Sequence, residues 1–187
     1  MKNIKIFLVV FLIAKSVQSQ NSLEVGVSAS VVRFSDDNAA FIGDKYIFQV
    51  PMLNVAYKFN SKFSLNAELA FNTIDDIGIM SNSVKYTSYG GALRYHFYDS
   101  SKLNTYALIG GTMVQSEFKN TPTLNFGIGN SYWLSDRLGI NAQAIYKFSE
   151  DRFESMRPHF QFTLGLVYSF DIDALFRAKT ICNQNGF

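Results

Sequence analysis

The stretch FQFTLGLVYSF, residues 160–170, decides the fold class, because large apolar residues alternate with small or polar ones along its whole length. The even-numbered positions carry Phe, Phe, Leu, Leu, Tyr and Phe, and the odd-numbered positions carry Gln, Thr, Gly, Val and Ser. A period of two residues is the period of a β-strand with two different faces, and no helical pattern fits it. The stretch is therefore predicted to be an amphipathic strand.

The same alternation recurs along the chain. It is clean in three further segments and weaker in four, two of which contain glycines that leave their facing uncertain. The clean segments are Leu23–Val31, Phe63–Asn72 and Leu138–Phe148; the weaker ones are Ile47–Phe59, Thr87–Phe97, Thr105–Val114 and Thr123–Leu134. Pro51 cannot donate a ladder hydrogen bond, so we expect it at a rim of the sheet. The sequence predicts an all-β, single-domain fold with eight strands.

The connections between these segments alternate in length. Four are long and polar: Ser35–Tyr46, Thr73–Tyr86, Gln115–Pro122 and Ser149–Pro158. The others are shorter: residues 60–62, 98–104 and 135–137. An antiparallel up-and-down meander with an even number of strands places all long loops at one end and all short turns at the other. We therefore predict a closed up-and-down barrel.

The distribution of side-chain volume indicates which face of the barrel points outward. Eight strands enclose an interior just wide enough to be filled by side chains, and the polar face consists of small residues that suit it. The bulky apolar face is then outside, in lipid, and strands of this length cover the apolar band of a transmembrane barrel. We expect two aromatic belts, as such barrels have. One lies beside the short turns (Tyr57, Phe59, Phe63, Tyr95, Phe97, Tyr106, Tyr132, Tyr168, Phe170) and one beside the long loops (Phe71, Tyr146, Phe148, Phe160). A soluble periplasmic sandwich is the alternative.

Residues 1–19 have the pattern of a secretory signal peptide: two lysines, a nine-residue apolar run and a small residue at a plausible cleavage point. The expected organisation is a signal peptide over 1–19, a barrel over 20–170 and a short periplasmic tail over 171–187.

The signal peptide holds three of the 17 basic residues and none of the 15 acidic ones, so the mature net charge is −1. That charge, without a long basic run, argues against nucleic-acid binding. One Cys and two His argue against a disulfide framework and a metal site.

Alternation places several charged side chains inside the barrel: Glu24, Lys58, Glu68, Arg94, His96 and Lys147. Buried charges must be paired, so we expect Glu24 or Glu68 to cluster with Lys58 and Arg94. This cluster is either a structural plug or a gate for small solutes.

His159 is also predicted to point inward, and Glu154 and Ser155 are expected to be ordinary loop residues. No nucleophile–base pair can be identified, so we predict no enzymatic activity and no cofactor.

Four residues of the last strand, Thr163, Gly165, Tyr168 and Phe170, match the terminal-strand motif read by the bacterial barrel-assembly machinery. With the eight-strand pattern, the chain resembles small bacterial outer-membrane β-barrels of the OmpA-transmembrane-domain and OmpX type. It departs from them in residues 171–187, because many such barrels end at the terminal aromatic. The resemblance implies an outer-membrane location, contact with membrane lipids and with the assembly machinery, and a monomer. It implies a structural or interaction role, either in envelope integrity or in binding an extracellular ligand through the long loops, with a largely plugged lumen. A narrow porin-like channel for small solutes is the alternative, and an outer-membrane lipid-modifying enzyme is less expected.

Overall fold

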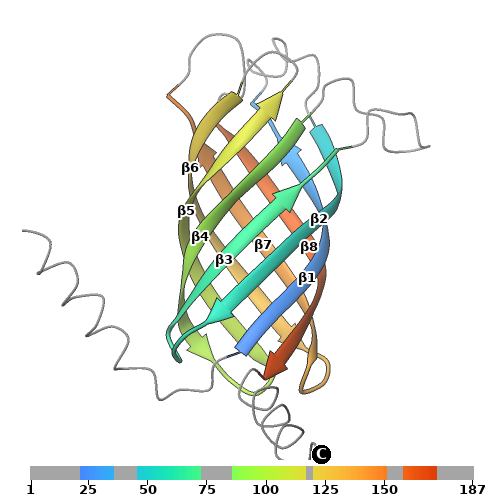
Figure 1. The fold of residues 1–187 in the computed structure, drawn as a ribbon, viewed down its shortest axis with the longest axis vertical. Helices are drawn as coiled ribbons and strands as arrows, with labels where there is room; N and C mark the ends of the chain where they lie inside the picture. Colours follow the sequence, from blue (N-terminus) through green and yellow to red (C-terminus); the bar gives the residue numbers. More distant parts are fainter. Residues whose placement is uncertain (1–21, 36–45, 73–85, 117–119, 151–157, 172–187) are drawn as a thin grey trace, which may run out of the picture.

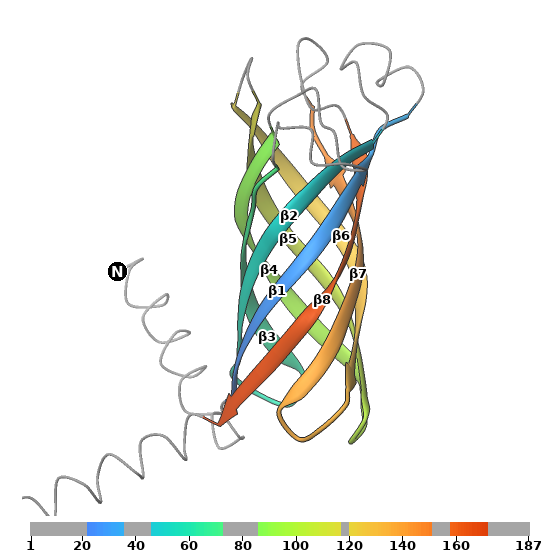
Figure 2. The same ribbon diagram turned by 90° about the vertical axis from the view of Figure 1, so that its right-hand side faces the viewer.

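The computed structural model describes residues 22–35, 46–72, 86–116, 120–150 and 158–171, and they form one closed antiparallel barrel (Figures 1 and 2). Its eight strands follow chain order, and β1 closes the barrel by pairing with β8. The strands are β1 (Ser22–Arg33), β2 (Tyr46–Lys58), β3 (Phe63–Ala70), β4 (Tyr86–Asp99), β5 (Leu103–Ser116), β6 (Asn120–Trp133), β7 (Leu138–Phe148) and β8 (His159–Asp171). The predicted fold class is confirmed.

The ends of the barrel differ in the connections that they carry. The turns after β2, β4 and β6 are short and lie together at one end, called here the short-turn end (Figure 1). The predicted long connections fall mostly outside the described residues, but the strands that they join end together at the opposite, long-loop end. The predicted signal peptide and nearly all of the predicted tail also lie outside the described residues. Within the described ranges, no helix is long and apolar enough to cross a membrane.

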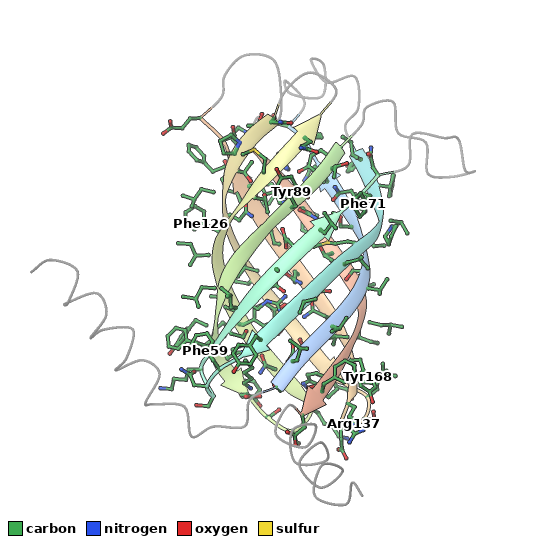
Figure 3. All side chains as sticks on the ribbon, viewed as in Figure 1. Phe59, Phe71, Tyr89, Phe126, Arg137 and Tyr168 are labelled. Carbon is green, nitrogen blue, oxygen red and sulfur yellow. The ribbon has the colours of Figure 1, made fainter. Side chains whose placement is uncertain are left out.

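The outer wall of the barrel is apolar and the interior is mainly polar, as strand alternation predicts. Leu164 and Ile128 are 62% and 60% exposed, whereas Asn66 on the inner face is 2% exposed. Aromatic side chains pack on the outer wall near both ends, including Tyr168 with Phe170 at the short-turn end. Figure 3 shows outward side chains at both levels, among them Phe59 and Tyr168 at one end and Phe71 at the other. The outward facing of the bulky side chains is confirmed.

Pro51 lies within β2 and not at the end of that strand, but it does lie at the edge of the pairing with β3, which ends at Met52↔Ala70. The register between β1 and β2 shifts here, from Ser28↔Met52 to Ser30↔Gln49. Val50 and Pro51 both face outward while Gln49 and Met52 are both buried, which is the behaviour of a β-bulge. A bulge disrupts the ladder locally, so a residue without an N–H is tolerated there.

β4 and β5 approach each other closely at two glycines. A Cβ atom on Gly110 would collide with the backbone carbonyl oxygen of Gly91 and lie 2.6 Å from the Cα of Ala92. These obstacles are backbone atoms, which cannot rotate away as a side chain can. Barrel closure at this point therefore requires a residue without a side chain.

Candidate functional site

The lumen is the candidate functional site, and its first layer lies near the short-turn end. Arg94 on β4 is 1% exposed, and its Nη1 lies 4.0 Å from Oε2 of Glu24 on β1. The guanidinium also lies over the ring of Tyr106 on β5, 4.6 Å from the ring centroid. Such cation–π contacts stabilise a cation that has lost its water. Arg94 is thus held between a carboxylate and an aromatic face.

Tyr106 therefore lies in the lumen and not in the outer aromatic belt where it was predicted. Its hydroxyl accepts a hydrogen bond from Nδ2 of Asn141 at 2.8 Å. Its ring lies against Gly129, where a Cβ atom would be 2.5 Å from the ring carbon Cζ. Because the glycines of β5 and β6 carry no side chain, the alternation pattern did not show which face of these strands points inward.

Lys58 was expected to cluster with Arg94 and with Glu24 or Glu68. It forms its ion pair instead with Asp99, at the rim of the short-turn end. Its Nζ lies 2.7 Å from Oδ2 of Asp99, whose side chain is 41% exposed. This pair borders an open polar cavity of about 630 Å³ at the short-turn end, here called the mouth cavity. Its lining also includes Glu24, Asn104 and Trp133. The lumen thus has an open polar cavity at its short-turn end, and the buried Arg94 is not part of the lining of that cavity.

A serine, a histidine and an asparagine lie in one hydrogen-bonded row beside this layer. Ser64 Oγ is 2.8 Å from His96 Nε2, and His96 Nδ1 is 2.6 Å from Asn104 Oδ1. A nucleophile, a base and an orienting group have this order in acyl-transfer enzymes, and the sequence alone did not reveal it. Ser64 is only 2% exposed, however, and of the three residues only Asn104 lines the mouth cavity. The row satisfies buried polar groups and ties β3, β4 and β5 together.

The middle layer is an ion pair that spans the lumen. Nζ of Lys147 on β7 lies 3.7 Å from Oε1 of Glu68 on β3, four strands away around an eight-stranded wall. Lys147 is fully buried and also lies 3.5 Å from Ser88 Oγ. Glu68 is thus brought to Lys147 and not to Lys58 or Arg94. The predicted pairing of Glu24 with Arg94 is present, whereas Glu68 and Lys58 pair with Lys147 and Asp99.

Above this pair, a layer of amide and hydroxyl groups joins three neighbouring strands on the inner wall. Gln161 Nε2 donates to Ser30 Oγ at 3.0 Å and to Gln49 Oε1 at 3.1 Å, and Ser30 Oγ donates to Gln49 at 2.6 Å. These residues come from β8, β1 and β2 and are 0–2% exposed. Hydrogen bonds of this kind offset the cost of burying polar groups.

An apolar cluster lies inside the barrel toward its long-loop end. It is here called the upper cluster and consists of Val32, Phe34, Ile47, Tyr86 and Val114, all 0–1% exposed. His159 packs on it, with its ring centroid 5.1 Å from that of Phe34. Its Nε2 lies 2.8 Å from Tyr86 Oη, which joins β8 to β4 across the lumen. The predicted inward direction of His159 is confirmed, whereas the upper cluster itself was missed because its members interrupt the polar pattern of the inner face.

The four residues of the terminal-strand motif lie on β8, two on each face. Thr163 is buried and Gly165 packs against Ser28 of β1, while Tyr168 and Phe170 are 37% and 38% exposed on the outer wall. The predicted loop residues Glu154 and Ser155 lie outside the described residues. Among the described residues, no group of three or more His, Cys, Asp or Glu side chains is placed to hold a metal ion.

Comparison with known proteins supports the fold at the level of structure. No family model and no curated protein sequence matches the chain. The N-terminal β-barrel domain of Pseudomonas aeruginosa OprF is similar to 82% of this chain over 100% of its own length, with a TM-score of 0.58 and 15% identity. The outer membrane protein OprG of the same organism is similar to 81% of this chain over 96% of its own, with a TM-score of 0.53 and 13% identity. The attachment invasion locus protein Ail of Yersinia pestis is similar to 82% of this chain over 100% of its own length, with a TM-score of 0.51 and 20% identity. The chain thus has the fold of bacterial outer-membrane barrels.

Proposed function

We propose that the protein is an integral barrel of the bacterial outer membrane with a closed lumen and a structural or interaction role. The apolar outer wall supports the membrane location, because a closed barrel satisfies all backbone groups of its strands in hydrocarbon. Export by a cleaved signal peptide over 1–19, a monomeric state and a tail over 171–187 in the periplasm belong to the same proposal. Envelope integrity, or binding of an extracellular ligand through the long loops, is the corresponding role.

The observation that supports a closed lumen most strongly is contact between opposite walls. Glu68 meets Lys147, and Tyr86 meets His159, in both cases across four strands. Three of these four side chains are 0–1% exposed, and Glu68 is 7% exposed. An ion could pass only if both contacts opened, and opening would leave a buried charge unpaired.

The proposal predicts no single-channel openings in planar lipid bilayers. The measurement compares the wild-type protein with Arg94→Ala, which removes the cation of the first layer but leaves the Glu68–Lys147 pair and the upper cluster in place. Both proteins are expected to remain silent. Openings in the wild type would favour the narrow channel instead, and openings in Arg94→Ala alone would make the first layer a gate.

Recognition of β8 by the barrel-assembly machinery is also part of the proposal. The Phe170→Ala variant is expected to lower the amount of folded protein in the outer membrane of expressing cells, while refolding into detergent is unchanged. Phe162→Ala is the matched control, because Phe162 is an outward aromatic of the same strand, 47% exposed, outside the motif. Equal loss in both variants would contradict a specific assembly role for Phe170.

A further inference from the structure

The barrel wall has a notch at its long-loop end, between β6 and β7. β6 pairs with β5 from Asn120 onward, but its pairing with β7 begins only at Leu124↔Phe148. Residues 120–123 of β6 therefore extend beyond the last pair with β7. Pro122 lies in this stretch, and proline is a residue that strand edges tolerate because it has no N–H to pair.

A cavity of about 570 Å³ occupies the notch, a volume within the range of small-molecule sites. Its lining residues are Pro122, Thr123, Leu124, Phe148, Ser149 and Glu150. Leu124 and Phe148 are 47% and 40% exposed and belong to the apolar outer wall, whereas Thr123 and Ser149 are each 6% exposed. The cavity is thus continuous with the surface that we propose to face lipid.

The chemistry of the lining defines a ligand with two parts. Leu124, Phe148 and Pro122 offer an apolar wall for a hydrocarbon chain. Glu150 adds a carboxylate at the rim and is the only charged residue among the described residues that line the cavity. A carboxylate attracts a cationic head group and repels an anionic one.

From this geometry we propose that the notch binds a single-chain amphiphile with a cationic head group. The hydrocarbon chain lies along Leu124 and Phe148, and the head lies at Glu150. The site rests on the proposed membrane location, and it adds a function that a sealed lumen does not provide: selective retention of one amphiphile class in the outer wall.

The test uses tryptophan quenching by chain-brominated amphiphiles in phosphatidylcholine vesicles. Trp133 is the single tryptophan of the chain, so a Trp133→Phe background carrying Phe148→Trp reports on the notch alone. Phe160→Trp in the same background is the matched control, because Phe160 is an outward aromatic near the same end, 48% exposed. The probes are an ω-bromoundecyltrimethylammonium salt and ω-bromoundecanoate. Quenching at Phe148→Trp is expected to saturate at a low mole fraction of the cationic probe, and quenching at Phe160→Trp to rise in proportion to mole fraction.

Adding Glu150→Lys separates a built site from ordinary contact with lipid. This exposed substitution is expected to reverse the preference at Phe148→Trp, so that the anionic probe saturates it and the cationic probe does not. Proportional quenching at both positions, or a preference unchanged by Glu150→Lys, would overturn the proposed site while leaving the membrane location intact. Absence of any quenching at Phe160→Trp would instead contradict the membrane location itself.

Discussion

Gly110→Ala is expected to prevent closure of the barrel, or to lower its free energy of unfolding by about 3 kcal/mol, the upper end of the usual cost of overpacking. The added methyl group would collide with the carbonyl oxygen of Gly91 and crowd the Cα of Ala92, so β4 and β5 would have to separate. Separation breaks ladder hydrogen bonds that have no water to replace them inside a membrane. The measurement is urea unfolding of the protein in detergent micelles, followed by Trp133 fluorescence.

The neighbouring Gly111→Ala is the control for this prediction. A Cβ atom on Gly111 points to the outer wall and its nearest obstacle is the carbonyl oxygen of Thr123 at 3.3 Å, a distance that a small shift relieves. Its expected effect lies within about 0.5 kcal/mol, as for most substitutions on open surfaces. If both variants unfold at the same urea concentration, close approach of β4 and β5 is not what requires Gly110.

Lys147→Met is expected to cost about 3–5 kcal/mol of the free energy of unfolding, because it leaves the Glu68 carboxylate buried without its cation. Lys147 is 0% and Glu68 7% exposed, so water does not screen the remaining charge. The measurement is again urea unfolding in micelles. Lys58→Met is the comparison, since the partner of Lys58, Asp99, is 41% exposed and such rim pairs contribute at most about 1 kcal/mol.

The double variant Glu68→Leu/Lys147→Met distinguishes a buried pair from a simple loss of packing. Replacing both partners by apolar groups of similar size removes the unpaired charge, so most of the stability should return. A double variant as unstable as Lys147→Met alone would show that the lost stability comes from packing at Lys147 and not from the unpaired Glu68 carboxylate. The single variant should also be tested for conductance, because it opens one of the two contacts across the lumen.

The strands were predictable from the sequence because alternation with a period of two is a local property. The predicted segment Leu138–Phe148 coincides with β7, and the other strands agree within a few residues at their ends. The facing of β5 and β6 was not predictable, since glycines carry no side chain to indicate a face. Tyr106 was consequently assigned to the outer belt although it lies in the lumen.

The contents of the lumen were predictable, but their pairing was predictable only in part, for Glu24 with Arg94. Alternation correctly placed Glu68, Arg94 and Lys147 inside. Which of them meet depends on the stagger of the strands around the barrel, which no single segment encodes. Apolar residues that face inward, such as Tyr86 and Ile145, appear in the sequence only as breaks in the polar face. The upper cluster could therefore be recognised only from the structure, in which β1, β2, β4 and β5 bring its members together.

Whether the protein is an integral membrane barrel is tested most directly by the electrophoretic mobility of the purified protein in detergent. Protein refolded into micelles should show a β-type circular dichroism spectrum and a mobility in dodecyl sulfate gels that changes only after boiling. That result is expected because a closed barrel with an apolar outer wall resists unfolding by the detergent at low temperature. A monomer that is soluble and folded in water without any detergent would contradict the account.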